Sequence, residues 1–195
     1  MKKLLVIVAV LAISASSFAQ VKFGVKAGTN IASITGDDGE GLDSRTSFVF
    51  GGFAKFELSE KFAFQPELLY SMQGAAGSES YEGVNVDVTM KTDYLNIPLM
   101  AKYYVTEGFS LQAGPQVGFL LSAKFKMEAN GQEEEEDIKD QMKGVDFGLN
   151  FGAGYELDFG LGFDVRYNLG LTNVADYDEA DGKNGVFQIT ASYAF

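Results

Sequence analysis

Apolar and polar side chains alternate almost without exception over residues 161–172. One set of alternate positions is entirely apolar and comprises Leu161, Phe163, Val165, Tyr167, Leu169 and Leu171. The intervening positions are small or polar and comprise Gly162, Asp164, Arg166, Asn168, Gly170 and Thr172. Successive side chains of a β-strand point to opposite faces. The pattern therefore predicts a strand with one apolar and one polar face.

The same two-residue period recurs in seven further segments. Together the segments predict eight strands, over residues 21–31, 47–58, 62–73, 90–105, 109–127, 145–157, 161–173 and 185–195. In the fifth strand, the alternate apolar positions from Phe109 to Phe125 are predicted to share one face. Pro115 has no N–H to donate to a sheet, so it predicts a bulge or a local break in that strand.

The connections between these strands alternate in length. Three are short turns, at residues 59–61, 107–108 and 158–160. Four are long and polar, at residues 32–46, 74–89, 128–144 and 174–184. Short periplasmic turns and long outside loops are typical of outer-membrane barrels. We therefore predict an all-β fold, an eight-stranded antiparallel up-and-down transmembrane β-barrel with four long outside loops and three short periplasmic turns.

Periodicity alone does not say which face points outward, because a soluble lipocalin-like barrel alternates in the same way with its apolar face around a ligand. The glycine-rich polar face favours an outward apolar face, since the interior of an eight-stranded barrel is only just wide enough for side chains. Roughly forty apolar side chains, many of them aromatic, would overfill so narrow a lumen. Because an open sheet edge has no partner in hydrocarbon, the first strand is expected to pair with the last.

The beginning of the chain has the pattern of an export signal. Two lysines precede an apolar run over residues 4–15, and small residues at 17–19 (Ser-Phe-Ala) precede a cleavage point. The apolar run is about 12 residues long, well short of the ~20 that a transmembrane helix requires. We predict a signal peptide over residues 1–19 and one barrel domain over residues 20–195, located in the outer membrane of a Gram-negative cell.

The composition argues against several classes of function. A net charge of −12 disfavours binding to nucleic acid and anchoring to lipid through a basic patch. The chain has no cysteine and no histidine, which removes thiolate chemistry, the usual general base and the commonest metal ligand. We therefore expect no enzymatic activity, no cofactor and no metal centre. A carboxylate pair formed by Glu67 and Glu156 stays open as an acid–base alternative.

Charged residues occur at positions that are predicted to face the lumen. The cations are Lys22, Lys26, Lys55, Lys102, Lys124 and Arg166. The anions are Glu57, Glu67, Asp146, Glu156 and Asp164. Buried charges must be paired or hydrated, so near-equal numbers of both signs predict a salt-bridged plug. An ion-conducting pore is the alternative, although wide aqueous channels need roughly 16 strands.

Acidic residues concentrate in two of the predicted outside loops, at residues 128–140 and 176–181. Runs of like charge are usually solvated and mobile, which is the simplest interpretation of both loops. A weak calcium site, or a divalent bridge to anionic lipopolysaccharide, is the alternative. The spacing of the carboxylates does not match the calcium-binding loop of an EF-hand.

The last strand alternates aromatic and polar residues and ends in an aromatic residue. Tyr193 and the terminal Phe195 resemble the signal that the barrel assembly machinery of the outer membrane reads during biogenesis. We expect the mature chain to contact outer-membrane lipid and lipopolysaccharide, and to be a monomer.

Two stretches carry a more specific resemblance, FGVKAGTNIASITG at residues 23–36 and DYLNIPLMAKYY at residues 93–104. They resemble the outer-membrane β-barrel family common in Bacteroidetes, which includes PorT-like and OmpX-like small barrels. The resemblance implies a structural, adhesion or interaction role, with some members linked to protein secretion or gliding. It supplies no catalytic or binding residues to transfer to this chain. A narrow pore or small-ligand channel and a soluble ligand-binding barrel are the alternatives.

Overall fold

The computed structural model describes residues 21–81, 84–129, 131–177 and 179–195. The predicted signal peptide at residues 1–19 lies outside the described residues. The described part contains nine strands, β1 (Val21–Thr35), β2 (Asp43–Glu57), β3 (Phe62–Tyr81), β4 (Val84–Tyr104), β5 (Phe109–Ala129), β6 (Gln132–Asp137), β7 (Val145–Glu156), β8 (Leu161–Asn173) and β9 (Lys183–Ala194). Two short 3₁₀ turns, η2 (Asp37–Gly39) and η3 (Lys139–Gln141), lie in the long connections. No helix within the described ranges is long and apolar enough to cross a bilayer.

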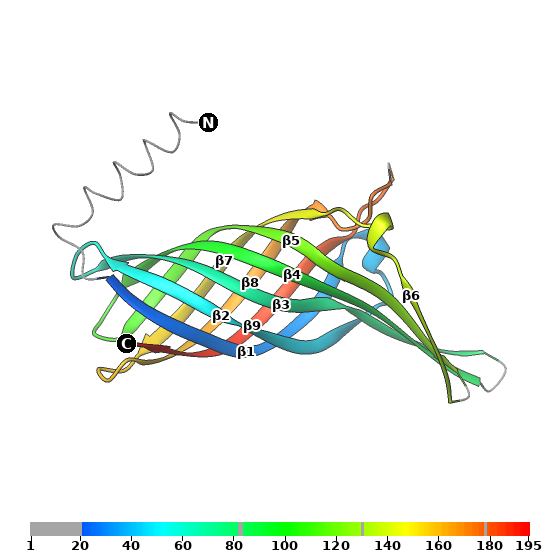
Figure 1. Cartoon of the computed structure of the whole chain (residues 1–195), viewed down its shortest axis with the longest axis horizontal. Coiled ribbons are helices and arrows are strands. Elements are labelled where there is room, and N and C mark those ends of the chain that lie inside the picture. Colours follow the sequence, from blue (N-terminus) through cyan, green and yellow to red (C-terminus); the bar gives the residue numbers. More distant parts are fainter. Residues whose placement is uncertain (1–20, 82–83, 130, 178) are drawn as a thin grey trace.

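Eight of the strands form a closed antiparallel ring. Their order around the ring is β1, β2, β3, β4, β5, β7, β8 and β9, and β9 pairs with β1 to close it. The closing pair runs from Gly24 opposite Ala194 to Thr35 opposite Lys183. The predicted eight-stranded up-and-down barrel is therefore confirmed, and Figure 1 shows its strands winding obliquely around the axis. β6 pairs with β5 and lies outside the ring.

The two ends of the barrel differ in the length of their connections. We call one the turn end, because the β2–β3, β4–β5 and β7–β8 connections there are short. Val21 lies at this end because it pairs with Phe56 beside the β2–β3 turn. The C-terminus marked in Figure 1 lies there too, and the Phe195 N–H donates to the Phe23 carbonyl at 2.9 Å. We call the opposite end the loop end. The β1–β2, β5–β7 and β8–β9 connections there are long, and β3 and β4 continue there as a long hairpin.

Three strands continue far beyond the ring at the loop end. β3, β4 and β5 contain 20, 21 and 21 residues, compared with 12, 13 and 12 in β7, β8 and β9. With β6 they form a four-stranded antiparallel sheet, the long extension at the right of Figure 1. We call this sheet the projection and define it as residues 74–81, 84–91, 124–129 and 132–137.

The sequence predictions of loops at residues 74–89 and 128–144 are wrong over the projection. The acidic strand β6 pairs with β5 from Lys124 opposite Asp137 to Ala129 opposite Gln132. Lysines on β4 and β5 neutralise part of the negative charge of β6. This lowers the repulsion among its carboxylates that would otherwise disfavour pairing with β5. A strand that is polar on both faces also lacks the apolar alternation from which strands are recognised.

A β-bulge in β5 reverses the direction of its side chains near the loop end. Pairing with β4 passes from Tyr94 opposite Leu120 to Asp93 opposite Ser122, which leaves Leu121 as the inserted residue. As a result Leu120 and Ala123 are both buried on the inner side. The prediction that one apolar face continues from Phe109 to Phe125 is therefore wrong beyond this bulge.

At Pro115 the structure has a local break in the pairing of β5 with β4, which is one of the two predicted alternatives, and no bulge. The register of β5 against β4 is the same on both sides of it, at Gln116 opposite Pro98 and at Ala113 opposite Ala101. Pro115 itself lies opposite Leu149 of β7 in a continuous register. A proline removes one donor from a ladder but adds no residue to the strand. Gly114 and Pro115 therefore form no pairs with β4, while the register on either side is kept.

The apolar faces of the ring strands point outward. Large side chains such as Phe48 and Phe147 are 65% and 56% exposed. Many other large apolar side chains on the outer face are also exposed. They include Val25, Phe50, Leu68, Leu111, Phe151, Phe163, Val165, Leu169, Leu171 and Ile189. A contiguous apolar belt of this extent is unusual on a protein that faces water and suits contact with hydrocarbon. The lipocalin-like alternative, with the apolar face inward, is wrong.

Glycines on the inner side allow neighbouring strands to approach and bend sharply. A Cβ atom built on Gly28 would lie 2.1 Å from the Ile189 carbonyl oxygen of β9, and one on Gly114 would lie 2.0 Å from the Leu99 carbonyl oxygen of β4. Both contacts are too short for a real side chain. A ring of only eight strands curves strongly, and glycine provides the necessary space at such bends.

Candidate functional site

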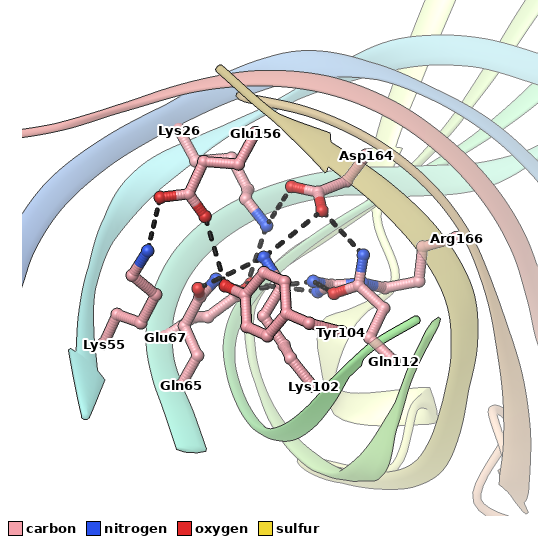
Figure 2. A network of polar contacts seen from close by, with 10 residues as sticks. All are labelled: Lys26, Lys55, Gln65, Glu67, Lys102, Tyr104, Gln112, Glu156, Asp164 and Arg166. Carbon is pink, nitrogen blue, oxygen red and sulfur yellow. Dashed lines mark hydrogen bonds and ion pairs between the residues drawn. The ribbon is translucent and has the colours of Figure 1, made fainter. Parts of the chain in front are cut away.

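The centre of the lumen is filled by an ion network built around Glu67 of β3. The Lys26 ammonium of β1 lies 2.9 Å from Glu67 Oε1. The Arg166 guanidinium of β8 binds the same carboxylate with both terminal nitrogens, Nη1 to Oε2 and Nη2 to Oε1, each at 2.9 Å. Figure 2 shows these side chains converging from different walls of the barrel. Two parallel hydrogen bonds of this kind are among the strongest that a carboxylate forms.

Asp164 of β8 is the second anion of the network. Its Oδ2 lies 3.0 Å from the Lys26 ammonium, and its Oδ1 lies 3.8 Å from the Lys102 ammonium. Gln112 donates to Asp164 Oδ1 at 2.6 Å and accepts from Arg166 Nη2 at 3.0 Å. Gln65 completes the set by donating to the Glu67 carboxylate at 2.8 Å (Figure 2). The network therefore holds three cations and two anions, with amide groups between them.

These five charged side chains are sealed from solvent. The exposed fraction of each lies between 0% for Glu67 and 7% for Lys102. They come from β1, β3, β4 and β8, strands that are distributed around the ring. The network therefore spans the lumen from wall to wall. An unpaired buried charge costs several kcal/mol or more, so the pairing is what allows this number of charges inside a barrel.

A second, wetter layer of charges lies between the ion network and the turn end. Lys55 pairs with Glu156 and lies 3.3 Å from Glu57 Oε1, and Lys22 lies 2.9 Å from the same Glu57 oxygen. The Tyr104 hydroxyl donates to Glu156 Oε2 at 3.2 Å. These side chains line a cavity of about 1000 Å³ that opens at the turn end. We call this cavity the vestibule.

Amide side chains fill the lumen on the other side of the ion network. Asn168 donates to Asn150 at 3.3 Å, and Asn150 donates to Gln116 at 3.2 Å. Asn184 donates to Asp146 Oδ2 at 3.0 Å. Asp146 thus lies among amides, apart from the charged groups with which it was grouped in the sequence, and its Oδ1 atom has no hydrogen-bond partner among the described residues.

The loop end of the lumen is closed by an apolar cluster, which we call the cap. It consists of Ile34, Ala75, Tyr94, Leu120, Ala123, Met142 and Val174. Met142 and Val174 come from two long connections that bind each other over the mouth of the barrel. Lys143 N–H donates to the Val174 carbonyl and Asp176 N–H donates to the Gln141 carbonyl, each at 2.9 Å. Sequence reasoning missed the cap, although apolar residues in otherwise polar connections were a usable signal.

The predicted lumen residues fall into three groups. Lys26, Glu67, Lys102, Asp164 and Arg166 meet in the ion network. Lys22, Lys55, Glu57 and Glu156 meet at the vestibule. Asp146 lies in the amide layer, as described above. Glu67 and Glu156, the pair considered for acid–base chemistry, are bound by different cations in different layers.

The prediction that Lys124 faces the lumen is wrong. Its side chain is 46% exposed and lies on the projection, 2.6 Å from Glu135 Oε1. The cause is the bulge at Leu121, beyond which even-numbered residues of β5 continue the outer face of the ring. Lys91 also binds Glu135, at 2.9 Å. Hydrogen bonds from Lys124 and Lys91 hold the pKa of the Glu135 carboxyl at about 2, well below its ordinary value.

The residues proposed as an assembly signal lie on the outer face at the turn end. Tyr193 and Phe195 are both exposed, and their ring centroids are 6.3 Å apart. Within the described residues no group of three or more Asp and Glu side chains is arranged to hold a metal ion.

The apolar belt and the closed ring agree with the sequence comparison. Residues 16–176 match the family described as "Outer membrane protein beta-barrel domain". The chain belongs to this family. No curated protein matches the sequence. As an outer-membrane β-barrel, the protein has its exposed apolar belt in contact with the lipid of that membrane.

This outer-membrane barrel is also similar to solved structures of other barrels. The attachment invasion locus protein Ail of Yersinia pestis superposes with a TM-score of 0.53 at 15% identity, over 90% of this chain and 99% of Ail. Neisserial surface protein A superposes with a TM-score of 0.54 at 11% identity, over 90% of this chain and 99% of that protein. Another structure of Ail, with the heparin analogue sucrose octasulfate, gives a TM-score of 0.52 at 16% identity over the same shares of the two chains. At these identities the likeness concerns the fold.

Proposed function

We propose that this outer-membrane barrel is a closed structural and interaction protein, which conducts no solute and presents the projection outside the cell. The observation that carries the proposal is the filled lumen. A solute that enters from the vestibule meets the ion network of Lys26, Glu67, Asp164 and Arg166, then the amide layer, and then the cap. Passage would require breaking several buried ion pairs at once, and each exposed charge would then have to be rehydrated in a narrow space.

A narrow pore is the alternative function. The vestibule supports it only in part, because this cavity of about 1000 Å³ is bounded by charged groups that already have partners, such as Lys55 and Glu156. A channel in a barrel of this size would need a continuous row of water-accessible side chains. The side chains that lie across the middle of the lumen are at most 7% exposed. We therefore favour a plug over a pore, and we expect no catalysis.

The interaction role is supported by the shape and charge of the loop end. The projection extends well beyond the ring (Figure 1), and its strand β6 carries five acidic residues in six positions. The polyanion sucrose octasulfate is bound by Ail. An acidic surface disfavours a ligand of that kind, so we infer that this barrel selects cationic partners instead.

Several parts of the proposal concern biogenesis and context. We propose that residues 1–19 are removed as a signal peptide and that Tyr193 and Phe195 are read by the barrel assembly machinery. The mature protein then functions as a monomer in contact with lipopolysaccharide. The resemblance of residues 23–36 and 93–104 to PorT-like barrels of Bacteroidetes supports a link between the interaction role and protein secretion.

Two measurements test the proposed function. The first is conductance in planar lipid bilayers, where the purified barrel is expected to give no stable current steps. The matched control removes side chains from all three layers, and current steps are expected in it. It combines Glu67→Ala/Arg166→Ala in the ion network, Asn150→Ala/Asn168→Ala in the amide layer and Met142→Gly/Val174→Gly in the cap. Steady conductance of the unaltered barrel, at the level of this variant, would contradict the plug.

The second measurement tests the orientation of the barrel. The natural chain has no cysteine, so a single introduced cysteine is a unique label. Glu134→Cys on the projection is expected to react with a membrane-impermeant maleimide on intact cells. Ser59→Cys in the β2–β3 turn is expected to react only after the outer membrane is permeabilised. The opposite result would mean that the projection lies in the periplasm.

A further inference from the structure

The projection has two unlike faces, which are set by the register of its strands. One face continues the outer wall of the ring and carries Lys91, Lys124 and Lys126 together with acidic side chains of β6. Each of these lysines is paired with an acidic side chain on the same face. Glu135 binds Lys91 at 2.9 Å and Lys124 at 2.6 Å, and Glu133 binds Lys126 at 2.9 Å. The lysines on this face therefore neutralise most of its carboxylates, although Asp87 and Asp137, which share the face, form no ion pair with any described residue.

The other face of the projection continues the inner wall of the ring and is apolar. Met90 lies opposite Phe125 and packs against the cap, so the buried cluster extends directly onto the projection. Farther out, Val88 lies opposite Met127, whose side chain is 42% exposed. Val86 and Ala129 form the next pair. We call these six side chains the apolar face.

Two carboxylates border the apolar face along one side. On β6, Glu136 lies opposite Phe125 and Glu134 lies opposite Met127, so both share the face of these apolar side chains. Both are exposed, and neither forms an ion pair with any described residue, in contrast to Glu133 and Glu135 one position away. Alternate residues of a strand are about 7 Å apart, so the two charges form a short row along the edge of the apolar face.

We propose that the apolar face, with Glu134 and Glu136, binds a peptide segment of a partner protein that combines apolar side chains with lysine or arginine. The inference rests on the proposed function, which locates the projection outside the cell. The apolar side chains of the partner would cover Val88, Phe125 and Met127, and its cations would neutralise the two carboxylates. The charge complementarity follows from the unpaired glutamates, and the apolar contact follows from the exposed Met127 and the half-buried apolar side chains around it.

Other occupants fit the surface less well. The lipid bilayer contacts the outer wall of the ring, whereas the apolar face continues the inner wall and is turned away from it. A second copy of this chain would oppose glutamates with glutamates, and the net charge of −12 adds to the repulsion. An anionic ligand would meet the same two carboxylates.

The test uses the full-length mature barrel in nanodiscs of zwitterionic lipid. The probe is a short fluorescent peptide of leucine and lysine, and the matched probe replaces each lysine with glutamate. Fluorescence anisotropy measures binding, with empty nanodiscs as the background. The unaltered barrel is expected to bind the lysine peptide and not the glutamate peptide. Equal binding of both peptides, or no binding above the empty nanodiscs, would overturn the proposal.

Two double variants with the same change in net charge distinguish binding at the apolar face from an effect of the total charge of the protein. Glu134→Lys/Glu136→Lys alters the apolar face, and Glu128→Lys/Glu133→Lys alters the opposite face. The first is expected to weaken binding about tenfold, and the second by less than about twofold, since each exposed ion pair contributes up to about fivefold. Equal losses in the two variants would show that only the total charge matters and would refute the proposed face.

A third variant, Met127→Ser, tests the apolar contribution and is expected to weaken binding about fivefold. Unchanged affinity would mean that the contact is purely electrostatic, contrary to the proposal. Each variant is first checked for the heat-modifiable gel mobility of a folded barrel. The conductance and cysteine-labelling experiments above do not depend on the peptide. If both gave the expected results but the peptide did not bind, the proposed peptide site would be refuted and the proposed function would stand.

Discussion

The ion network yields a quantitative prediction for Glu67→Gln. This substitution preserves the shape of the side chain but removes the charge that Lys26 and Arg166 share, at distances of 2.9 Å. Lys26, Lys102 and Arg166 would then face Asp164 alone, inside a lumen that excludes water. Removing one partner from a buried ion pair typically costs about 3–5 kcal/mol. We expect a loss of that size in the free energy of unfolding.

The matched variant Glu67→Gln/Arg166→Met removes one charge of each sign. Lys26 and Asp164 remain paired at 3.0 Å in this variant, and the excess of cations over anions is the same as in the unaltered network. We therefore expect the double variant to lose only about 1–2 kcal/mol, because replacing a buried pair by neutral groups is often close to neutral. The double variant would then be at least about 1 kcal/mol more stable than Glu67→Gln alone, which would show that the two sites interact.

Unfolding by urea in lipid vesicles measures these differences, with the folded fraction read from gel mobility before and after heating. The control is Glu60→Gln in the exposed β2–β3 turn, which we expect to change stability by less than about 0.5 kcal/mol. If Glu67→Gln behaved like this control, the Glu67 carboxylate would have to be hydrated. The lumen would then be open to water at its centre, and the proposed plug would be refuted.

Three further predictions concern the belt, the glycines and the projection. Leu169→Arg in the outward belt should lower stability by ~2–4 kcal/mol if it lies near the middle of the bilayer, measured by the same vesicle unfolding assay. Gly154→Ala places a Cβ atom 2.3 Å from Asp164 Oδ1 and should cost about 1–3 kcal/mol in that assay, whereas Gly52→Ala, with its nearest neighbour at 3.5 Å, should change stability by less than about 1 kcal/mol. Because the pKa of Glu135 is lowered to about 2, its ion pairs stabilise the projection fully above about pH 4.5 and are lost as pH falls toward 2. Carbon-13 chemical shifts of this carboxyl group should therefore titrate near pH 2, and a midpoint above 4 would contradict the paired arrangement.

The sequence contained enough information to predict the barrel, because burial by lipid on one side imposes a strict alternation on every strand. Leu169 and Asn168 illustrate this rule, since one is exposed in the belt and the other is buried in the lumen. The closing pair of β1 and β9 followed from the requirement that no edge remain open in hydrocarbon. These parts of the fold depend on local side-chain chemistry.

The contacts inside the lumen could not be predicted in the same way. Which cation contacts Glu67 depends on the register of the strands around the ring. A shift of one strand by two residues would keep its apolar side chains on the outer face but would give each of its lumen side chains a different partner. The bulge at Leu121 left no clear mark in the sequence, since leucine occupies both positions 120 and 121. Lys124 was therefore assigned to the lumen. β6 was missed because its pairing depends on lysines that are distant in sequence, such as Lys91.

The cap has a consequence for the order of events during insertion. Met142 and Val174 belong to two different connections, so the seal can form only after both hairpins have crossed the membrane and their backbones have joined. Until then the loop end of the lumen lacks this apolar seal. We therefore expect the charges of the ion network to pair before the loop end of the lumen is closed.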